Sequence, residues 1–248
     1  MKNNFFSLNR FLYYFKLNVK LNLKDYLLAL SVITLIIIAL NFLNSLTTKT
    51  IGISYEEFNS YCYYIMLYLV GFHLAGISFS SFKDKNRISG LLTIPVSSFE
   101  KYISSLLINS ILFFISFSVL YSLGTFIFFI LSGSTHSFYN TFNDGSLFFS
   151  VLFFSLQSIF FAGSLFFKRY ETLKTVLIIL LVTVVIYFLN YILLYGIYFI
   201  TNFTYNRLMF TPLYVNVYYA VYSVLFFIVL PVLCLIAGYF RLKEAEFI

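Results

Sequence analysis

Residues 175–194 read TVLIILLVTVVIYFLNYILL, a stretch of the sequence without a single charged side chain. A transmembrane helix needs about 20 apolar residues to cross the hydrocarbon core of a bilayer. A strand of a membrane β-barrel would instead alternate apolar and polar residues, and this stretch does not alternate. It therefore predicts a helix that spans a membrane.

Comparable apolar runs occur along the whole chain. Including the run just quoted, they predict six transmembrane helices, at residues 26–46, 61–82, 104–131, 146–167, 175–200 and 217–240. The chain is 61% hydrophobic and only 10% charged, whereas soluble domains carry roughly 25% charged residues. We therefore expect an all-α membrane protein, embedded in membrane lipid, with six spans.

The basic residues predict the orientation of these spans. Fourteen of the sixteen Lys and Arg residues fall before the first span, in the second and fourth connections or in the tail, and only Lys49 and Arg207 fall in the opposite connections. Cytoplasmic segments carry this excess of positive charge, so both termini are expected in the cytoplasm. The net charge of +7 then reflects orientation and not nucleic-acid binding. We expect a multi-pass protein of the cell membrane, specifically a bacterial inner membrane.

Three regions follow from this plan. Residues 1–25 form an N-terminal cytoplasmic segment, residues 26–240 a single transmembrane domain that includes a cytoplasmic segment at 83–103, and residues 241–248 a tail. Part of the N-terminal segment alternates like a strand. We prefer an amphipathic helix, because an isolated strand at a membrane surface leaves its backbone groups unpaired. Anchoring to the membrane is the simplest role for it.

The connection between the second and third spans reads FKDKNRISGLLTIPVSSFEKYISSLL at residues 82–107. Apolar residues at near-helical spacing predict a short amphipathic helix, which Pro95 ends because proline disfavours the helical conformation of the residue before it. Ser97 and Glu100 then match a capping box, so a new helix is expected to start at Ser97 and to continue into the third span. The short helix either docks on a soluble partner or lies on the membrane surface.

The cores of the predicted spans contain no Asp, Glu, Lys or Arg. A carrier driven by an ion gradient usually needs such groups, so the pattern disfavours that class. The candidates for an intramembrane polar site are His73, Asn41, Gln157 and Asn190. His73 either serves as a proton or substrate site or, as we prefer, packs as a neutral histidine between helices. The amides either join helices or line a polar path.

Signatures of catalysis are missing from the sequence. It has neither a phosphate-binding loop with Lys-Ser/Thr, nor a Gly-x-Ser-x-Gly elbow, nor metal-ligand spacing. We therefore expect neither enzymatic activity nor a cofactor or metal in this chain. If ATP drives the protein, a separate subunit must bind the nucleotide.

Two segments resemble ABC-2-type transporter permeases. They are LLTIPVSSFEKYISSLL at residues 91–107 and YFRLKEAEF at residues 239–247. The resemblance implies the permease subunit of an ATP-binding-cassette exporter. It also implies a homo- or heterodimer of such subunits above two ATPase subunits, which bind ATP and Mg. Against the family pattern, the connection before the sixth span is short and lacks an evident pair of re-entrant helices.

The resemblance also implies that residues 83–95 act as a coupling helix in a cleft of the ATPase. The residues it assigns to this coupling are Arg87, Gly90, Leu91, Leu92, Ile94, Pro95 and Glu100. The apolar members would pack into the ATPase, and Arg87 would pair with an acidic residue there. Gly90 and Pro95 would set the turn, and Glu100 would fix the start of the third span. The apolar spans suit an amphipathic or lipidic cargo. A subunit that anchors or senses without transporting is the alternative.

Overall fold

A computed structural model describes residues 6–51, 55–79, 96–131, 139–141, 146–167, 170–201 and 222–247. All regular secondary structure in these residues is helical. In chain order the elements are α1 (Leu8–Ile51), α2 (Tyr55–Ile77), α4 (Ser98–Leu106), η2 (Leu107–Leu112), α5 (Phe113–Leu131), α6 (Ser146–Phe166), α7 (Glu171–Thr201), η3 (Leu225–Val229) and α10 (Leu230–Phe247). Elements η2 and η3 are π-helical.

Among the described residues, five helical stretches are long and apolar enough to cross a bilayer. They are Glu56–Ile77, Ser98–Leu131, Phe148–Phe166, Glu171–Ile192 and Tyr222–Glu244. The second of them consists of α4, η2 and α5, which form one continuous helix. Because it matches the third predicted run, it is called the third span below. These helices make the chain a multi-pass membrane protein.

Helix α1 is a single helix of 44 residues. The helical interpretation of the N-terminal segment is therefore correct, but the segment is not separate from the first predicted span, since the helix crosses residue 25 without a break. The physical reason is visible in the sequence, because residues 8–51 contain neither glycine nor proline to end a helix. Within α1 the part of the first predicted span whose side chains the structure describes, Ser31–Phe42, is an apolar stretch.

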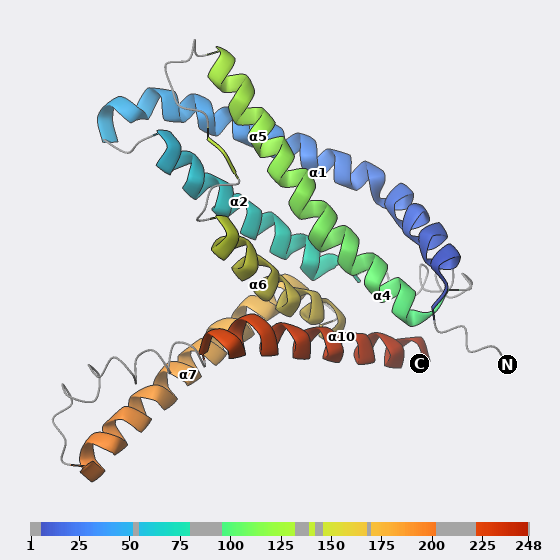
Figure 1. Ribbon diagram of the computed structural model, residues 1–248, viewed down its shortest axis with the longest axis vertical. Coiled ribbons are helices and arrows are strands. Elements are labelled where there is room, and N and C mark those ends of the chain that lie inside the picture. The colour runs from blue at the N-terminus through green and yellow to red at the C-terminus, as the bar shows by residue number, and fades with distance from the viewer. Residues whose placement is uncertain are drawn as a thin grey trace.

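The helices pack in two groups that meet at α2 and α6. In Figure 1, α1 runs beside α5, with α2 next to both, while α6, α10 and α7 lie at the other side of the molecule. Helix α4 contacts both α1 and α10. The third span therefore touches the first and the last helix of the chain at its beginning.

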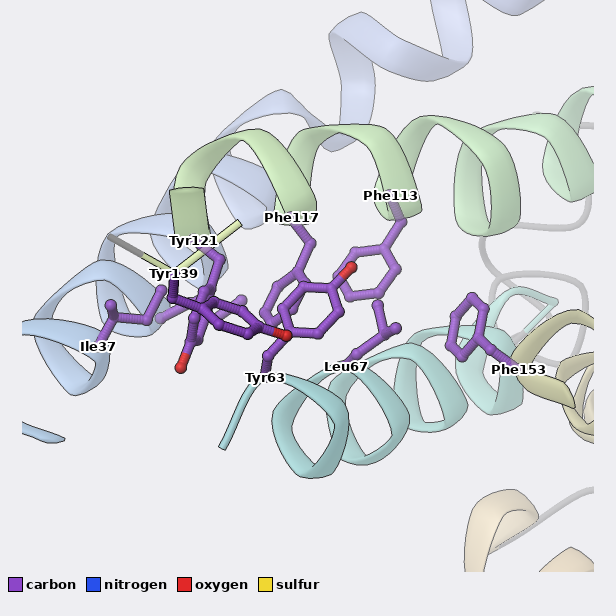
Figure 2. Close-up of a cluster of buried hydrophobic side chains, with 9 residues drawn as sticks. Ile37, Tyr63, Leu67, Phe113, Phe117, Tyr121, Tyr139 and Phe153 are labelled. Atoms are coloured by element: carbon purple, nitrogen blue, oxygen red, sulfur yellow. The ribbon is translucent and has the colours of Figure 1, made fainter. Parts of the chain in front are cut away.

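The first group is held by a cluster of buried aromatic side chains, here called the Tyr63 cluster. Figure 2 shows Tyr63 and Leu67 of α2 beneath Phe117 and Tyr121 of α5, with Ile37 of α1 closing the end. The Tyr63 hydroxyl is 2.8 Å from Ser118 Oγ, and the Tyr121 hydroxyl donates to the Asn59 carbonyl at 2.9 Å. Buried tyrosines satisfy their hydroxyl groups in this way.

Within the described residues, helix α7 packs against α2 and α6 mainly through its beginning. Gly76 and Gly163 lie directly against Thr172 and Thr175, so a Cβ atom at either glycine would overlap the threonine side chain. Beyond Thr175 nearly every described side chain of α7 is exposed, and the helix extends away from the others in Figure 1. Its apolar surface is therefore available to lipid or to another chain.

Candidate functional site

The third span begins as the sequence predicts. Ser97 is the N-cap of α4, its hydroxyl accepts a hydrogen bond from the Glu100 amide at 3.3 Å, and its own amide donates to Glu100 Oε2 at 3.0 Å. Both halves of the capping box are present, which confirms the expected helix start. The reciprocal bonds satisfy two of the amide groups that every helix leaves unpaired at its N-terminus.

Glu100 does more than close this box. Its other carboxylate oxygen, Oε1, accepts from the Ser7 amide at 2.7 Å and from Arg10 Nη2 at 3.2 Å. Ser7 directly precedes α1, so one fully buried carboxylate receives amide groups from the starts of two helices. The positive ends of both helix dipoles favour a negative charge at this position. Glu100 thereby fixes the start of α1 to the start of the third span.

Tyr102, two residues further along α4, makes the corresponding contact with the last helix. Its hydroxyl donates to the Leu235 carbonyl at 2.7 Å. A Cβ atom at Gly238 would lie 2.9 Å from that hydroxyl and 3.6 Å from the Ala162 Cα atom, so the glycine permits close packing of α10 on α4 and α6. Together Glu100 and Tyr102 make α4 a junction of three helices, here called the α4 junction.

The remaining predicted coupling residues lie outside the described residues. They are Arg87, Gly90, Leu91, Leu92, Ile94 and Pro95. Only Glu100 of that set is described, and its position agrees with the expected role of fixing the start of the third span. The assignment of the others to an ATPase interface stays a prediction.

The four predicted intramembrane polar residues lie on four different helices. Asn41 Nδ2 donates to the Ile37 carbonyl of its own helix at 2.9 Å. Asn190 Nδ2 likewise donates to the Ile186 carbonyl, and its Oδ1 accepts from the Tyr222 hydroxyl at 3.0 Å, which links α7 to the helical turn before η3. His73 is exposed on the surface of α2, whereas we preferred a histidine packed between helices.

Gln157, like Asn190, has a hydrogen-bond partner on another helix that the sequence does not reveal. Its Nε2 donates to the Asn109 carbonyl at 2.8 Å, and Asn109 lies in the π-helical segment η2. Within the described residues Gln157 Oε1 has no hydrogen-bond partner. A π-helical turn changes the backbone bonding pattern of the helix, and here the carbonyl of such a turn accepts a bond from a neighbouring span. The amide thus joins α6 to the third span.

In the part of the chain that the structure describes, no three His, Cys, Asp or Glu side chains come together in a way that could hold a metal ion. Cys62 and Cys234 are both half-buried free thiols on different helices. In this part of the chain, hydrogen bonds of Glu100, Tyr102 and Gln157 connect the helices to one another.

Comparison with known proteins gives no relative, since neither a protein-family model, nor a curated protein, nor a solved structure matches this chain.

Proposed function

We propose that this chain is the permease subunit of an ABC-2-type exporter, moving an amphipathic or lipidic substrate with ATP hydrolysed by a separate subunit. It would sit in a bacterial inner membrane as a homo- or heterodimer, with six spans and both termini in the cytoplasm. The ATPase would dock on residues 83–95, immediately before the third span.

The α4 junction is the observation that carries this proposal. A movement imposed on residues 83–95 enters the third span at Ser97. From there it reaches α1 through the bonds of Glu100 to Ser7 and Arg10, and α10 through the bond of Tyr102 to Leu235. A short helix that joins three spans at one membrane face suits a subunit that a partner drives from outside the membrane.

The geometry of α1 supports two parts of the proposal. These are that α1 is itself a membrane span, which brings the number of spans to six, and that both termini lie on the same side of the membrane. Ser7, at the start of α1, is bonded to Glu100 at the start of the third span. At the other end, Ile51 is separated from Tyr55, the first residue of α2, by only three residues. Asn59 of α2 in turn lies against Tyr121, toward the far end of the third span. Helix α1 therefore runs from one end of the bundle to the other, and at about 1.5 Å per residue it is long enough to cross.

The test is purification of the tagged protein at native expression levels in mild detergent, with identification of bound proteins and an assay of ATPase activity. We expect a stoichiometric ATPase that Leu91→Asp or Leu92→Asp removes, because a carboxylate cannot be buried in an apolar cleft without a partner. Leu173→Asp is the control. Leu173 is an exposed leucine in the first turn of α7, on the predicted cytoplasmic side, and its replacement should leave the ATPase bound.

A preparation free of any ATPase would contradict the proposal, and the chain would then have to anchor or sense within another complex. Equal loss of the ATPase in all three aspartate variants would instead show that the docking site is not at residues 91 and 92.

A further inference from the structure

A cavity of about 410 Å³ lies among the third span, α6 and the last span. This volume falls within the roughly 300–1,000 Å³ that is usual for small-molecule sites. Its wall includes Ser110, Ile111, Val151, Ser155, Ser158, Phe227 and Pro231. These residues come from the third span, from α6 and from the last span.

Both π-helical segments of the described chain border this one cavity. Segment η2 contributes Ser110 and Ile111, and η3 contributes Phe227. Pro231 explains η3, because proline has no amide hydrogen and cannot give the Phe227 carbonyl its usual helical bond. Such turns account for well under about 1% of residues and occur frequently at functional sites. Their meeting at one cavity points to a binding site and not to a packing fault.

The chemistry of the wall favours a hydrocarbon over water as the occupant. All of its residues are uncharged and most are apolar. Ser155 Oγ donates to the Val151 carbonyl at 2.9 Å, and Ser158 Oγ donates to the Ser155 carbonyl at 2.7 Å, so these hydroxyl donors are used within α6. A buried water needs about 2–4 polar partners. An empty cavity would deprive its wall of van der Waals contacts, so a hydrocarbon is the occupant that fits.

The position of the cavity indicates where that hydrocarbon comes from. Its wall is drawn from the interior of the spans Ser98–Leu131, Phe148–Phe166 and Tyr222–Glu244, so it lies within the apolar depth of the membrane. Val151 is 49% exposed and Ile111 is 44% exposed, so they form a mouth that is continuous with the lipid-facing surface. An acyl chain can therefore enter sideways from the bilayer.

We propose that this cavity binds the hydrocarbon chain of a bilayer amphiphile. Two sources share this chemistry, a resident membrane lipid and an amphipathic molecule on its way out of the membrane. The second source rests on the proposed exporter function, whereas the binding site itself does not.

The experiment uses the purified full chain, without any partner, in phosphatidylcholine vesicles that contain a phosphatidylcholine with a diazirine in the middle of one acyl chain. After irradiation, the labelled peptides are identified by mass spectrometry. We expect label on the wall of the cavity, and about a tenfold loss of it, equivalent to about 1.4 kcal/mol, when Ile111→Trp or Val151→Trp fills the mouth from either side.

The matched control is Ile115→Trp, which adds the same side chain to an exposed position about one helical turn further along that is not part of the wall. It should leave the label unchanged. Equal labelling of the cavity peptides in all variants, or label confined to outer faces such as that of α7, would overturn the proposal.

A second arm distinguishes the two sources once an ATPase partner has been identified. A label that falls while ATP is hydrolysed and recovers without ATP identifies the occupant as cargo. A label that is the same with and without ATP identifies a resident lipid. Both results support the binding site. Failure to find any ATPase would remove the exporter proposal while leaving the result of the first arm intact.

Discussion

Glu100 shows how one side chain organises the predicted cytoplasmic face. It is fully buried, yet its carboxylate has three donors within hydrogen-bond distance, namely the amides of Ser7 and Ser97 and the guanidinium of Arg10. A buried carboxylate is stable only when it is bonded in this way. Its contribution is thus best tested by a substitution that keeps its shape.

Glu100→Gln is expected to lower the free energy of unfolding by about 1.5–3 kcal/mol, the usual size of hydrogen bonds to a charged group. Glutamine removes the charge and replaces one accepting oxygen with an NH₂ group that faces a donor. Thermal unfolding of the detergent-solubilised protein measures the effect. Glu244→Gln is the control, since Glu244 forms an exposed pair with Arg241 at 2.9 Å, and such pairs contribute about 0–1 kcal/mol. Equal unfolding temperatures for the two variants would contradict the role of Glu100.

Gln157→Leu is expected to cost about 1 kcal/mol, a typical value for a hydrogen bond between membrane helices, because it removes the bond to the Asn109 carbonyl. Gln157→Glu should destabilise the protein more than Gln157→Leu, since a buried carboxylate next to that carbonyl oxygen must take up a proton. The order of the unfolding temperatures, wild type above Leu above Glu, checks this. A Leu variant as stable as the wild type would show that the donor at this position is unimportant.

At the scale of elements, α7 depends on two glycines of neighbouring helices. Its first turn packs where Gly76 and Gly163 leave room for Thr172 and Thr175, and the rest of the helix has few contacts with the described chain. Apolarity alone predicts a span at residues 175–200. It does not predict that the packing contacts of this span gather at its beginning, because lipid-facing and protein-facing apolar residues look alike in a sequence.

Gly163→Ala is expected to destabilise the protein, although alanine favours helix by up to about 1 kcal/mol over glycine. The new Cβ would overlap the Thr175 side chain, whose Cγ2 and Cβ atoms lie at 3.1 and 3.2 Å from it, and overpacking costs about 1–3 kcal/mol. Rotation of Thr175 cannot relieve both contacts, so α7 must shift. Adding Thr175→Ala should restore the unfolding temperature, and a double variant that stays as unstable as Gly163→Ala would argue against this contact.

At the scale of the whole molecule, the paths of the helices predict which residues are reached from the same side of the membrane. In a chain with Cys62 and Cys234 replaced by serine, a single cysteine at Phe6 or Lys243 should react with a membrane-impermeant maleimide from one side. A cysteine at Glu56 should react from the other side. All three positions are exposed. Reaction of Phe6→Cys from the side of Glu56→Cys would mean that α1 does not cross.

The sequence by itself determined the helical class, the membrane environment, the approximate positions of five spans and the capped start of the third. These follow from composition, from runs of apolar residues and from local capping chemistry, all of which act between residues close together in the chain. For the same reason the absence of glycine and proline from residues 8–51 agrees with the unbroken α1.

Only the tertiary structure decided which polar and aromatic side chains face one another. Tyr63 is buried against Ser118, Glu100 reaches back to Ser7, Gln157 finds a carbonyl in a π-helical turn, and the two π-helical segments meet at one cavity. The physical reason is that in lipid the apolar pattern no longer separates inside from outside. Helix pairing then depends on close packing and on hydrogen bonds between residues distant in sequence.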